Sequence, residues 1–228
     1  NLNYNYVDPA GTSLVLNADH GTYDLNSDQF QPNYYYDPSG QTMLNSVIYH
    51  MYSPAKININ TVKGDYEQNF KKGKLSVGAK AAWVKTDNNF QRFNVTSSGE
   101  DLDKARSNRF VYRENINAGY ISYNRQYKTF MIQAGLRGEH TVSEGVSEGL
   151  KWEGGSYVSS TTSFKRSYTS LFPSAAITFN KNPMKQWSLT YSRRIDRPAY
   201  QDLNPFEYKM DEYTFMKGNV NLRPQYTN

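Results

Sequence analysis

Residues 187–228 carry the most information about this chain, and they read WSLTYSRRIDRPAYQDLNPFEYKMDEYTFMKGNVNLRPQYTN. In the first six of these residues, apolar and small polar side chains alternate, which predicts a strand with one apolar and one polar face. Three motifs follow in order: R-x-x-R-P at 194–198, L-N-P-F at 203–206 and G-N-x-x-L-x-P at 218–224. A strand followed by this series of motifs is the most informative feature of the sequence.

The composition combines low hydropathy with many aromatic residues. Hydrophobic residues make up 37% of the 228 residues and the mean hydropathy is −0.80, yet there are 20 Tyr, 11 Phe and 3 Trp. So many aromatic residues argue against a disordered chain. A membrane barrel accounts for both facts, because its strands alternate lipid-facing and lumen-facing residues and its tyrosines gather at the membrane interfaces. A soluble β-sandwich or a lipocalin-like barrel with Tyr-rich strands would have the same composition.

Several classes of protein are made improbable by what the sequence lacks. It contains no run of about 18 apolar residues that would form a membrane helix, and no signal peptide is visible. It has no cysteine, which excludes disulfides and thiolate metal sites. The net charge of +5 is spread along the chain and forms no basic cluster, so no nucleic-acid partner is expected. Because the chain begins at Asn1 in strand-like sequence, we expect an internal fragment.

The chain divides into hairpins in which short and long connections alternate. Turn-forming residues predict short turns at 8–11, 71–73, 127–128 and 180–183. Longer polar stretches are predicted as loops at 24–54, 94–107 and 141–166. Short periplasmic turns and long extracellular loops are typical of outer-membrane barrels, whereas a soluble sandwich has no reason to keep every second connection long. We therefore predict that the short turns lie together at one end of the sheet.

Period-two alternation also assigns side chains to two faces. The apolar set predicted to face lipid is Leu75, Val77, Ala79, Phe130, Ile132, Ala134, Leu171, Ala175 and Ile177. The charged residues predicted to face the lumen or a plug are Lys80, Arg113, Arg137 and Glu139, together with the polar Gln133. Glu114 falls on the apolar side of its strand, so we expect it at the outer interface. A slip in the alternation near Thr61 predicts a bulge or a change of environment.

Further motifs of the chain occur in a recognisable order. They are SPAKI at 53–57, KGDY at 63–66, GAK at 78–80, KTDN at 85–88, FVYRE at 110–114, AGLRGE at 134–139 and LFPS at 171–174. With the three C-terminal motifs, this order resembles the barrel region of TonB-dependent outer-membrane receptors, in particular the outer-membrane β-barrel family of the Bacteroidetes type. The resemblance covers nearly the whole chain.

The resemblance implies an all-β, antiparallel up-and-down transmembrane barrel of 22 strands, closed by an N-terminal plug. About eight or nine of those strands would lie in residues 1–228, as a partial barrel domain without the plug. The implied function is energy-coupled uptake of a nutrient across the Gram-negative outer membrane. The nutrient is not identified, and an oligosaccharide, a peptide or a metal chelate would fit. The implied partners are outer-membrane lipid or lipopolysaccharide, the protein's own plug, the TonB complex and a surface lipoprotein.

The sequence offers little support for chemistry of another kind. Ser53-x-x-Lys56 matches the nucleophile motif of serine β-lactamases, but the accompanying S-D-N and K-T-G motifs do not occur. His20, His50 and His140 have no partner at metal-binding spacing, and the acidic residues at 100–103 lack the spacing of a calcium loop. We therefore expect no catalytic residue, cofactor or metal.

Two questions remain open at this level. Trp152 and Tyr157 could stack on a sugar ligand or could brace the segment in which they lie. The chain could also be a soluble or surface-exposed β-sheet module without transport, which dependence on detergent would distinguish from a membrane barrel.

Overall fold

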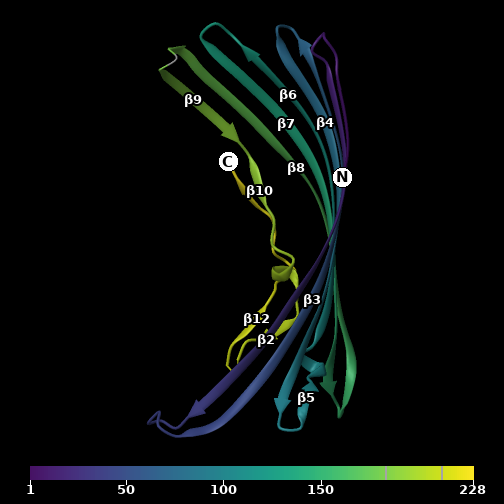
Figure 1. The fold of residues 1–228 in the computed structure, drawn as a ribbon, viewed down its shortest axis with the longest axis vertical. Helices are drawn as coiled ribbons and strands as arrows, with labels where there is room; N and C mark the ends of the chain where they lie inside the picture. Colours follow the sequence, from purple (N-terminus) through teal and green to yellow (C-terminus); the bar gives the residue numbers. More distant parts are fainter. Residues whose placement is uncertain (183, 212) are drawn as a thin grey trace.

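A computed structural model describes residues 1–182, 184–211 and 213–228, and the protein is built almost wholly of antiparallel strands. Nine strands form one curved sheet with a concave and a convex face (Figure 1). Its spatial order is β1-β2-β3-β4-β6-β7-β8-β9, and β5 pairs with β4. The bounds are β1 Leu2–Val7, β2 Ser13–Tyr36, β3 Met43–Phe70, β4 Gly73–Thr96, β5 Gly99–Leu102, β6 Asn108–Gln126, β7 Phe130–Glu153, β8 Ser156–Asn182 and β9 Lys185–Ser192. The predicted all-β, antiparallel class is confirmed, and the nine strands of this sheet agree with the eight or nine expected in residues 1–228.

The predicted long loops at 24–54 and 141–166 are wrong, because most of their residues are strand, whereas the predicted loop at 94–107 is only half strand. β2 has 24 residues and β3 has 28, and they stay paired up to Tyr36 and Met43. In the same way β7 and β8 remain paired out to Glu153 and Ser156. Their polar residues mislead a loop prediction, but Tyr, Thr and Ser side chains do not interrupt backbone ladders, and Tyr and Thr favour strands. No helix of the described residues is both long and apolar enough to cross a membrane.

The connections separate into two groups at opposite ends of the sheet (Figure 1). The turns after β1, β3 and β6 lie at one end, and the turns after β2, β4 and β7 lie at the other. This grouping follows from antiparallel order and agrees with the prediction for the turns at 8–11, 71–73 and 127–128. Of the predicted turn at 180–183, residue 183 lies outside the described residues. Which end faces the cell exterior stays a prediction.

Strand registers confirm the predicted division of side chains between two faces. Directly paired residues of neighbouring strands share a face, and the pairs join members of the apolar set, as in Ala134↔Ala175 and Ile132↔Ile177. The residues predicted to face the other way pair on the concave side, as in Arg137↔Phe172 and Lys80↔Ala118. The apolar convex band covers the half of each strand that is nearer the turns after β1, β3 and β6.

β6 differs from the prediction. Its apolar side, with Phe110 and Tyr112, lies on the concave face, where both residues are buried. Glu114 shares that side and is not at the lipid interface. Arg113 points to the convex face in register with Lys85 and Glu144, so its prediction as a lumen-facing residue is wrong. The reason is that a distant segment of the chain covers this part of the concave surface, which makes the inner side of β6 the apolar one.

The slip near Thr61 is a change of environment and not a bulge. β3 keeps one unbroken register with β2 from Ser13↔Glu67 to Tyr35↔Asn45, and its pairing with β4 keeps one register throughout. Ile57 and Ile59 therefore lie on the concave face, while Val62 and Tyr66 lie on the convex face. The apolar neighbours of β3 lie on the concave side near Ile57 and Ile59 and on the convex side near Val62 and Tyr66. The apolar side of the strand therefore changes along its length.

Residues 193–228 leave the sheet and cross its concave face (Figure 1). They form short elements: β10 Arg194–Asp196, the 3-10 turn η2 Gln201–Leu203, β11 Glu207–Lys209, β12 Phe215–Lys217 and β13 Gln225–Thr227. β10 pairs with β13 and β11 pairs with β12. A second 3-10 turn, η1 Lys104–Arg106, joins β5 to β6. We call residues 193–228 the inner segment, and its contact with β6 and β8 forms a buried apolar cluster of Phe110, Tyr112 and Leu203, with Phe164 packed against it.

Candidate functional site

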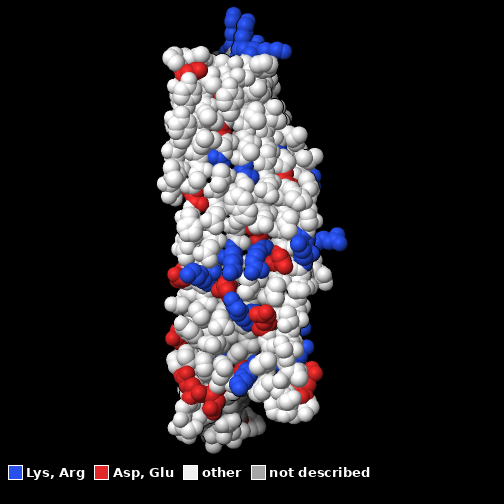
Figure 2. Space-filling model, turned by 90° about the vertical axis from the view of Figure 1, so that its right-hand side faces the viewer, with Lys and Arg blue, Asp and Glu red and all other residues white. Residues whose placement is uncertain are grey.

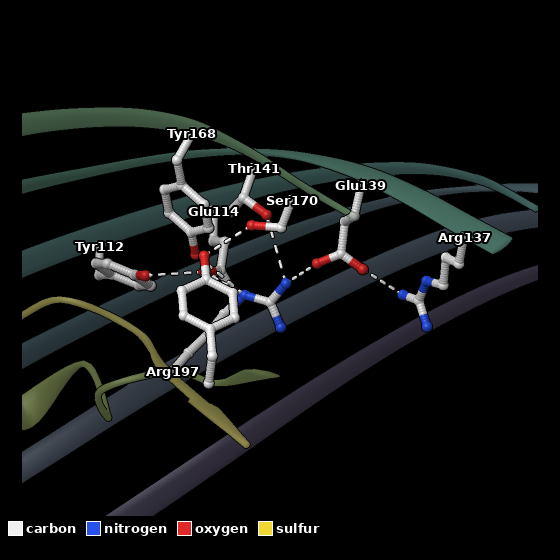
Figure 3. Close-up of polar contacts among 9 residues, drawn as sticks. Tyr112, Glu114, Arg137, Glu139, Thr141, Tyr168, Ser170 and Arg197 are labelled. Atoms are coloured by element: carbon white, nitrogen blue, oxygen red, sulfur yellow. Dashed lines mark hydrogen bonds and ion pairs between the residues drawn. The ribbon is translucent and has the colours of Figure 1, made fainter. Parts of the chain in front are cut away.

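Arg197 of the R-x-x-R-P motif anchors the inner segment to the concave face (Figure 3). Its guanidinium donates to a carboxylate oxygen of Glu139 on β7 and lies 3.8 Å from Glu114 on β6. It also donates to the hydroxyl oxygens of Tyr168, at 3.2 Å, and Thr141, at 3.4 Å. One cation thereby joins three neighbouring strands to a segment that follows them in the chain.

The charges at this anchor balance. The side chain of Glu139 is only 3% exposed, and it accepts from Arg137 as well as from Arg197. Two carboxylates, Glu114 and Glu139, therefore face two guanidinium groups. Burying a charge is costly unless it is paired and hydrogen-bonded, so the buried carboxylate of Glu139 depends above all on Arg197, while Arg137 is 49% exposed. Such an arrangement fixes one position of the inner segment.

Aromatic hydroxyl groups complete the polar shell around the anchor. Tyr112 donates to Glu114 at 3.2 Å, and burial of the Tyr112 side chain raises its pKa well above the ordinary value for tyrosine. The phenol therefore stays protonated at any physiological pH and continues to act as a donor. Tyr226 on β13 hydrogen-bonds Ser170 on β8 at 2.7 Å. The end of the inner segment is thus attached to the same strands as its beginning.

The L-N-P-F motif forms the apolar and amide part of the contact. Leu203 is 2% exposed and packs against Phe110 and Tyr112 of β6, with Phe164 and Tyr200 around it. The next residue, Asn204, forms hydrogen bonds through both the nitrogen and the oxygen of its side-chain amide. Its Nδ2 donates to Asn108 at 3.2 Å, and its Oδ1 accepts from Ser147 at 3.2 Å and from the backbone of Phe206.

Gly218 of the third motif lies directly against the second motif. A Cβ atom at this position would meet the carbonyl oxygen of Asn204 at 2.3 Å and that of Asp202 at 2.6 Å. The adjacent Asn219 N–H donates to the Asp202 carbonyl at 2.7 Å. The glycine is therefore required for close approach of two stretches of backbone.

We expect Gly218→Ala to loosen the inner segment by about 1–3 kcal/mol, because backbone atoms cannot move aside as a flexible side chain would. The amides of Asn204 and Asn219 should exchange with deuterium about 5- to 150-fold faster in the full-length protein. Gly119→Ala is the matched control, because the nearest atom to its Cβ would be 3.9 Å away. Equal exchange in both variants would contradict this packing.

A cavity of about 530 Å³ lies between the inner segment and the concave face. Its apolar and aromatic lining includes Leu25, Phe90, Phe110, Phe206, Tyr208 and Met216. Tyr208 packs on Phe90 with ring centroids 4.8 Å apart and donates to the sulfur of Met51 at 3.0 Å. A few polar groups, such as Asn88 and Asp202, also reach the cavity. Concave, mostly apolar sites with few polar groups are typical of ligand sites.

The residues predicted from the sequence as lumen-facing are only partly brought together. Arg137 and Glu139 lie on the concave face and form the ion pair described above. Lys80 lies on the same face of β4, and Arg113 lies on the opposite face. Among the described residues no group of three or more His, Asp or Glu side chains is placed to hold a metal ion.

Trp152 and Tyr157 are not loop residues but form the last pair but one of the β7–β8 hairpin. They are in direct register, with ring centroids 4.7 Å apart and an interplanar angle of 72°. Both rings are exposed and Lys104 lies over the Tyr157 ring. They support each other across the hairpin and still leave ring surface open, so a contact with ligand stays a prediction.

Sequence reasoning missed the role of Arg197, Glu114 and Leu203. The motifs R-x-x-R-P and L-N-P-F were visible, but nothing local indicates that they fold back onto strands formed by residues 108–170. The only available signal was Glu114 itself, a charge on an otherwise apolar strand side. Such a charge requires a partner of opposite sign.

His50 forms a second polar cluster, on the convex side of the protruding ends of β3 and β4 and beyond the apolar band. Its ring lies between Phe30, 4.3 Å away between centroids, and Phe93, 5.4 Å away. Its two ring nitrogens lie 2.8 Å from Glu100 on β5 and 2.8 Å from Asp28 on β2. The pKa of His50 is raised above its ordinary value of 6.5, first by the hydrogen bond to Glu100 and then by Asp28, against the opposing effect of burial.

We expect β5 to be held more firmly at low pH than at high pH. A raised histidine pKa contributes stability that is complete below pH 6.5, the ordinary pKa of histidine, and is lost as the pH rises through the folded-state pKa. Deuterium exchange at residues 99–102 of the full-length protein, corrected for the intrinsic pH dependence, should therefore quicken over that range. His50→Gln should remove the pH dependence. A wild-type profile that is flat from pH 5 to 9 would contradict it.

Comparison with known protein families identifies the family of this chain. The model of the outer membrane protein beta-barrel family matches residues 6–228, which is nearly the whole chain and includes the inner segment. No curated protein matches the chain significantly.

Proposed function

Because this protein belongs to the outer membrane protein β-barrel family, we propose that it forms part of a TonB-dependent receptor for energy-coupled uptake of a nutrient. Its location is the outer membrane. The observation that carries the proposal is the inner segment, which lies against the concave wall and encloses a cavity there. The nutrient class stays open among oligosaccharides, peptides and metal chelates.

The open sheet supports a wide barrel. Among the described residues, β1 and β9 each pair on one side only. Unpaired backbone groups are costly in a bilayer, so further strands must complete the ring. An eight-stranded barrel is just filled by its own side chains, whereas a much larger one encloses a channel or a plugged lumen. A concave face that already accommodates a 36-residue segment fits only the larger kind.

Within this proposal the residues have distinct roles. Lys80 and the exposed side of Arg137 face the interior and are available to a plug. Trp152 and Tyr157, at the end where the strands protrude beyond the apolar band, are placed to contact a ligand from outside. Coupling would require the plug, the TonB complex and, for ligand capture, a surface lipoprotein. No residue is assigned to catalysis.

The test is uptake by cells that carry or lack the full gene. Cells are given a mixture of oligosaccharides, peptides and metal chelates at limiting concentration, and depletion of each compound is followed by mass spectrometry. We expect at least one compound whose depletion requires the gene, requires TonB and stops when a protonophore is added. Restoring the full-length gene should restore its uptake. Depletion that is the same without the gene, or that continues without TonB, would reject the proposal.

A further inference from the structure

The convex face carries a belt of charge directly beyond its apolar band. Figure 2 shows this face, with a largely uncharged half and then Lys, Arg, Asp and Glu side chains gathered across the sheet at mid-height. On β4 the convex apolar residues run from Leu75 to Trp83, about 27 Å along the strand at ~3.4 Å per residue. Residues 75–83 thus have the ~9–11 residues with which a tilted strand crosses the apolar band of an outer-membrane barrel. The belt therefore lies at the level of lipid head groups.

The first row of this belt contains three cations. Lys85 on β4 is directly opposite Arg113 on β6, which is opposite Glu144 on β7, which is opposite Lys165 on β8. All three cationic side chains are exposed. In the part of the chain that the structure describes, none of the three takes part in an ion pair. One row further out the pattern differs, because Arg109 binds Asp87 through two hydrogen bonds of 2.9 and 2.7 Å.

The Lys85–Arg113 pair is unfavourable by itself. Like charges directly opposite each other on neighbouring strands destabilise a sheet. Glu144 lies opposite Arg113 on the other side, and Asp87 interacts with both cations but is itself bound to Arg109 through two hydrogen bonds. An anion held between Lys85 and Arg113 would remove the repulsion, and two cations of this kind match the charge of a phosphate group.

We propose that Lys85 and Arg113 bind a phosphate group of the lipid A part of lipopolysaccharide. The strands continue well beyond this row, to Thr96 on β4 and Glu153 on β7. In outer-membrane barrels the longer extensions lie outside the cell, which places the row in the outer leaflet. Acyl chains of the same lipid would lie against the apolar band below. The proposal depends on the outer-membrane location and not on transport, so either can fail without the other.

The test uses the full-length protein, purified and delipidated in detergent, with lipid A as the probe and native mass spectrometry as the readout. We expect the K85Q/R113Q variant to bind lipid A at least tenfold more weakly than wild type. The control variant is K63Q/K80Q, which removes a directly opposed lysine pair from the concave face, and it should bind within twofold of wild type. Circular dichroism and heat-dependent gel migration verify that each variant is folded.

A second measurement needs no variant. Wild-type protein should bind phosphatase-treated lipid A at least tenfold more weakly than intact lipid A, and phosphatidylglycerol should not compete. Equal binding of the two forms of lipid A would overturn the proposal, as would equal binding by K85Q/R113Q and wild type. Binding of phosphatidylglycerol as tight as that of lipid A would also overturn it, because a general affinity for anionic lipid would then suffice.

Discussion

Arg197→Met is expected to release the inner segment from the concave face. The substitution keeps an unbranched side chain but removes the guanidinium, which leaves Glu139, 3% exposed, with Arg137 alone and leaves Glu114 without a cation. Removing one member of a buried ion pair costs about 3–5 kcal/mol, because the remaining charge stays buried without compensation. Deuterium exchange of the inner segment in the full-length protein should therefore rise about 150- to 5,000-fold.

Two further variants separate charge from packing. Arg137→Met is the control, since Arg137 is 49% exposed and an exposed bridge contributes at most about 1 kcal/mol. The double variant Glu139→Leu, Arg197→Met removes both partners and should recover much of the lost protection, as replacement of a buried pair by apolar residues often does. If the inner segment of Arg197→Met exchanges deuterium within threefold of the wild-type rate, Arg197 does not hold the segment on the concave face.

Leu203→Ala is expected to have the next largest effect. Leu203 is 2% exposed in the cluster with Phe110 and Tyr112, and deletion of buried methyl groups costs about 2–5 kcal/mol, depending on how far the site can collapse. The amide of Asn219 bonds the carbonyl of Asp202, the residue before Leu203. That amide should lose protection in parallel with the rest of the inner segment, which exchange resolved by peptide would detect.

Two control substitutions test whether burial of Leu203 is the cause: a conservative change at Leu203 and the same truncation at an exposed leucine. Leu203→Met keeps the volume and should cost less than about 1.5 kcal/mol. Leu222→Ala removes the same atoms from a side chain of the same segment that is 37% exposed, so we expect a clearly smaller loss of protection. Should Leu222→Ala match Leu203→Ala, burial in the cluster could not be the cause.

Some features of this protein follow directly from the alternation of side chains along its strands. Alternation along β4, β7 and β8 was enough to assign Leu75, Ala134 and Ile177 to one face and Lys80 to the other. It was also enough to predict an antiparallel sheet with short turns at one end. These features depend on contacts between a residue and its near neighbours in sequence, since successive side chains of a strand point in opposite directions whatever the rest of the fold does.

Other features depend on contacts between distant parts of the chain. The inner side of β6 is apolar at Phe110 and Tyr112 because Leu203 packs there, and Glu114 can lie among them because Arg197 reaches it. Alternation indicates that a strand has two kinds of face but not which surroundings each face meets. It therefore placed Arg113 on the wrong side and left Glu114 without a partner. Their positions were decided only when residues 193–228 folded back onto the concave face, since burial and charge pairing there belong to both surfaces together.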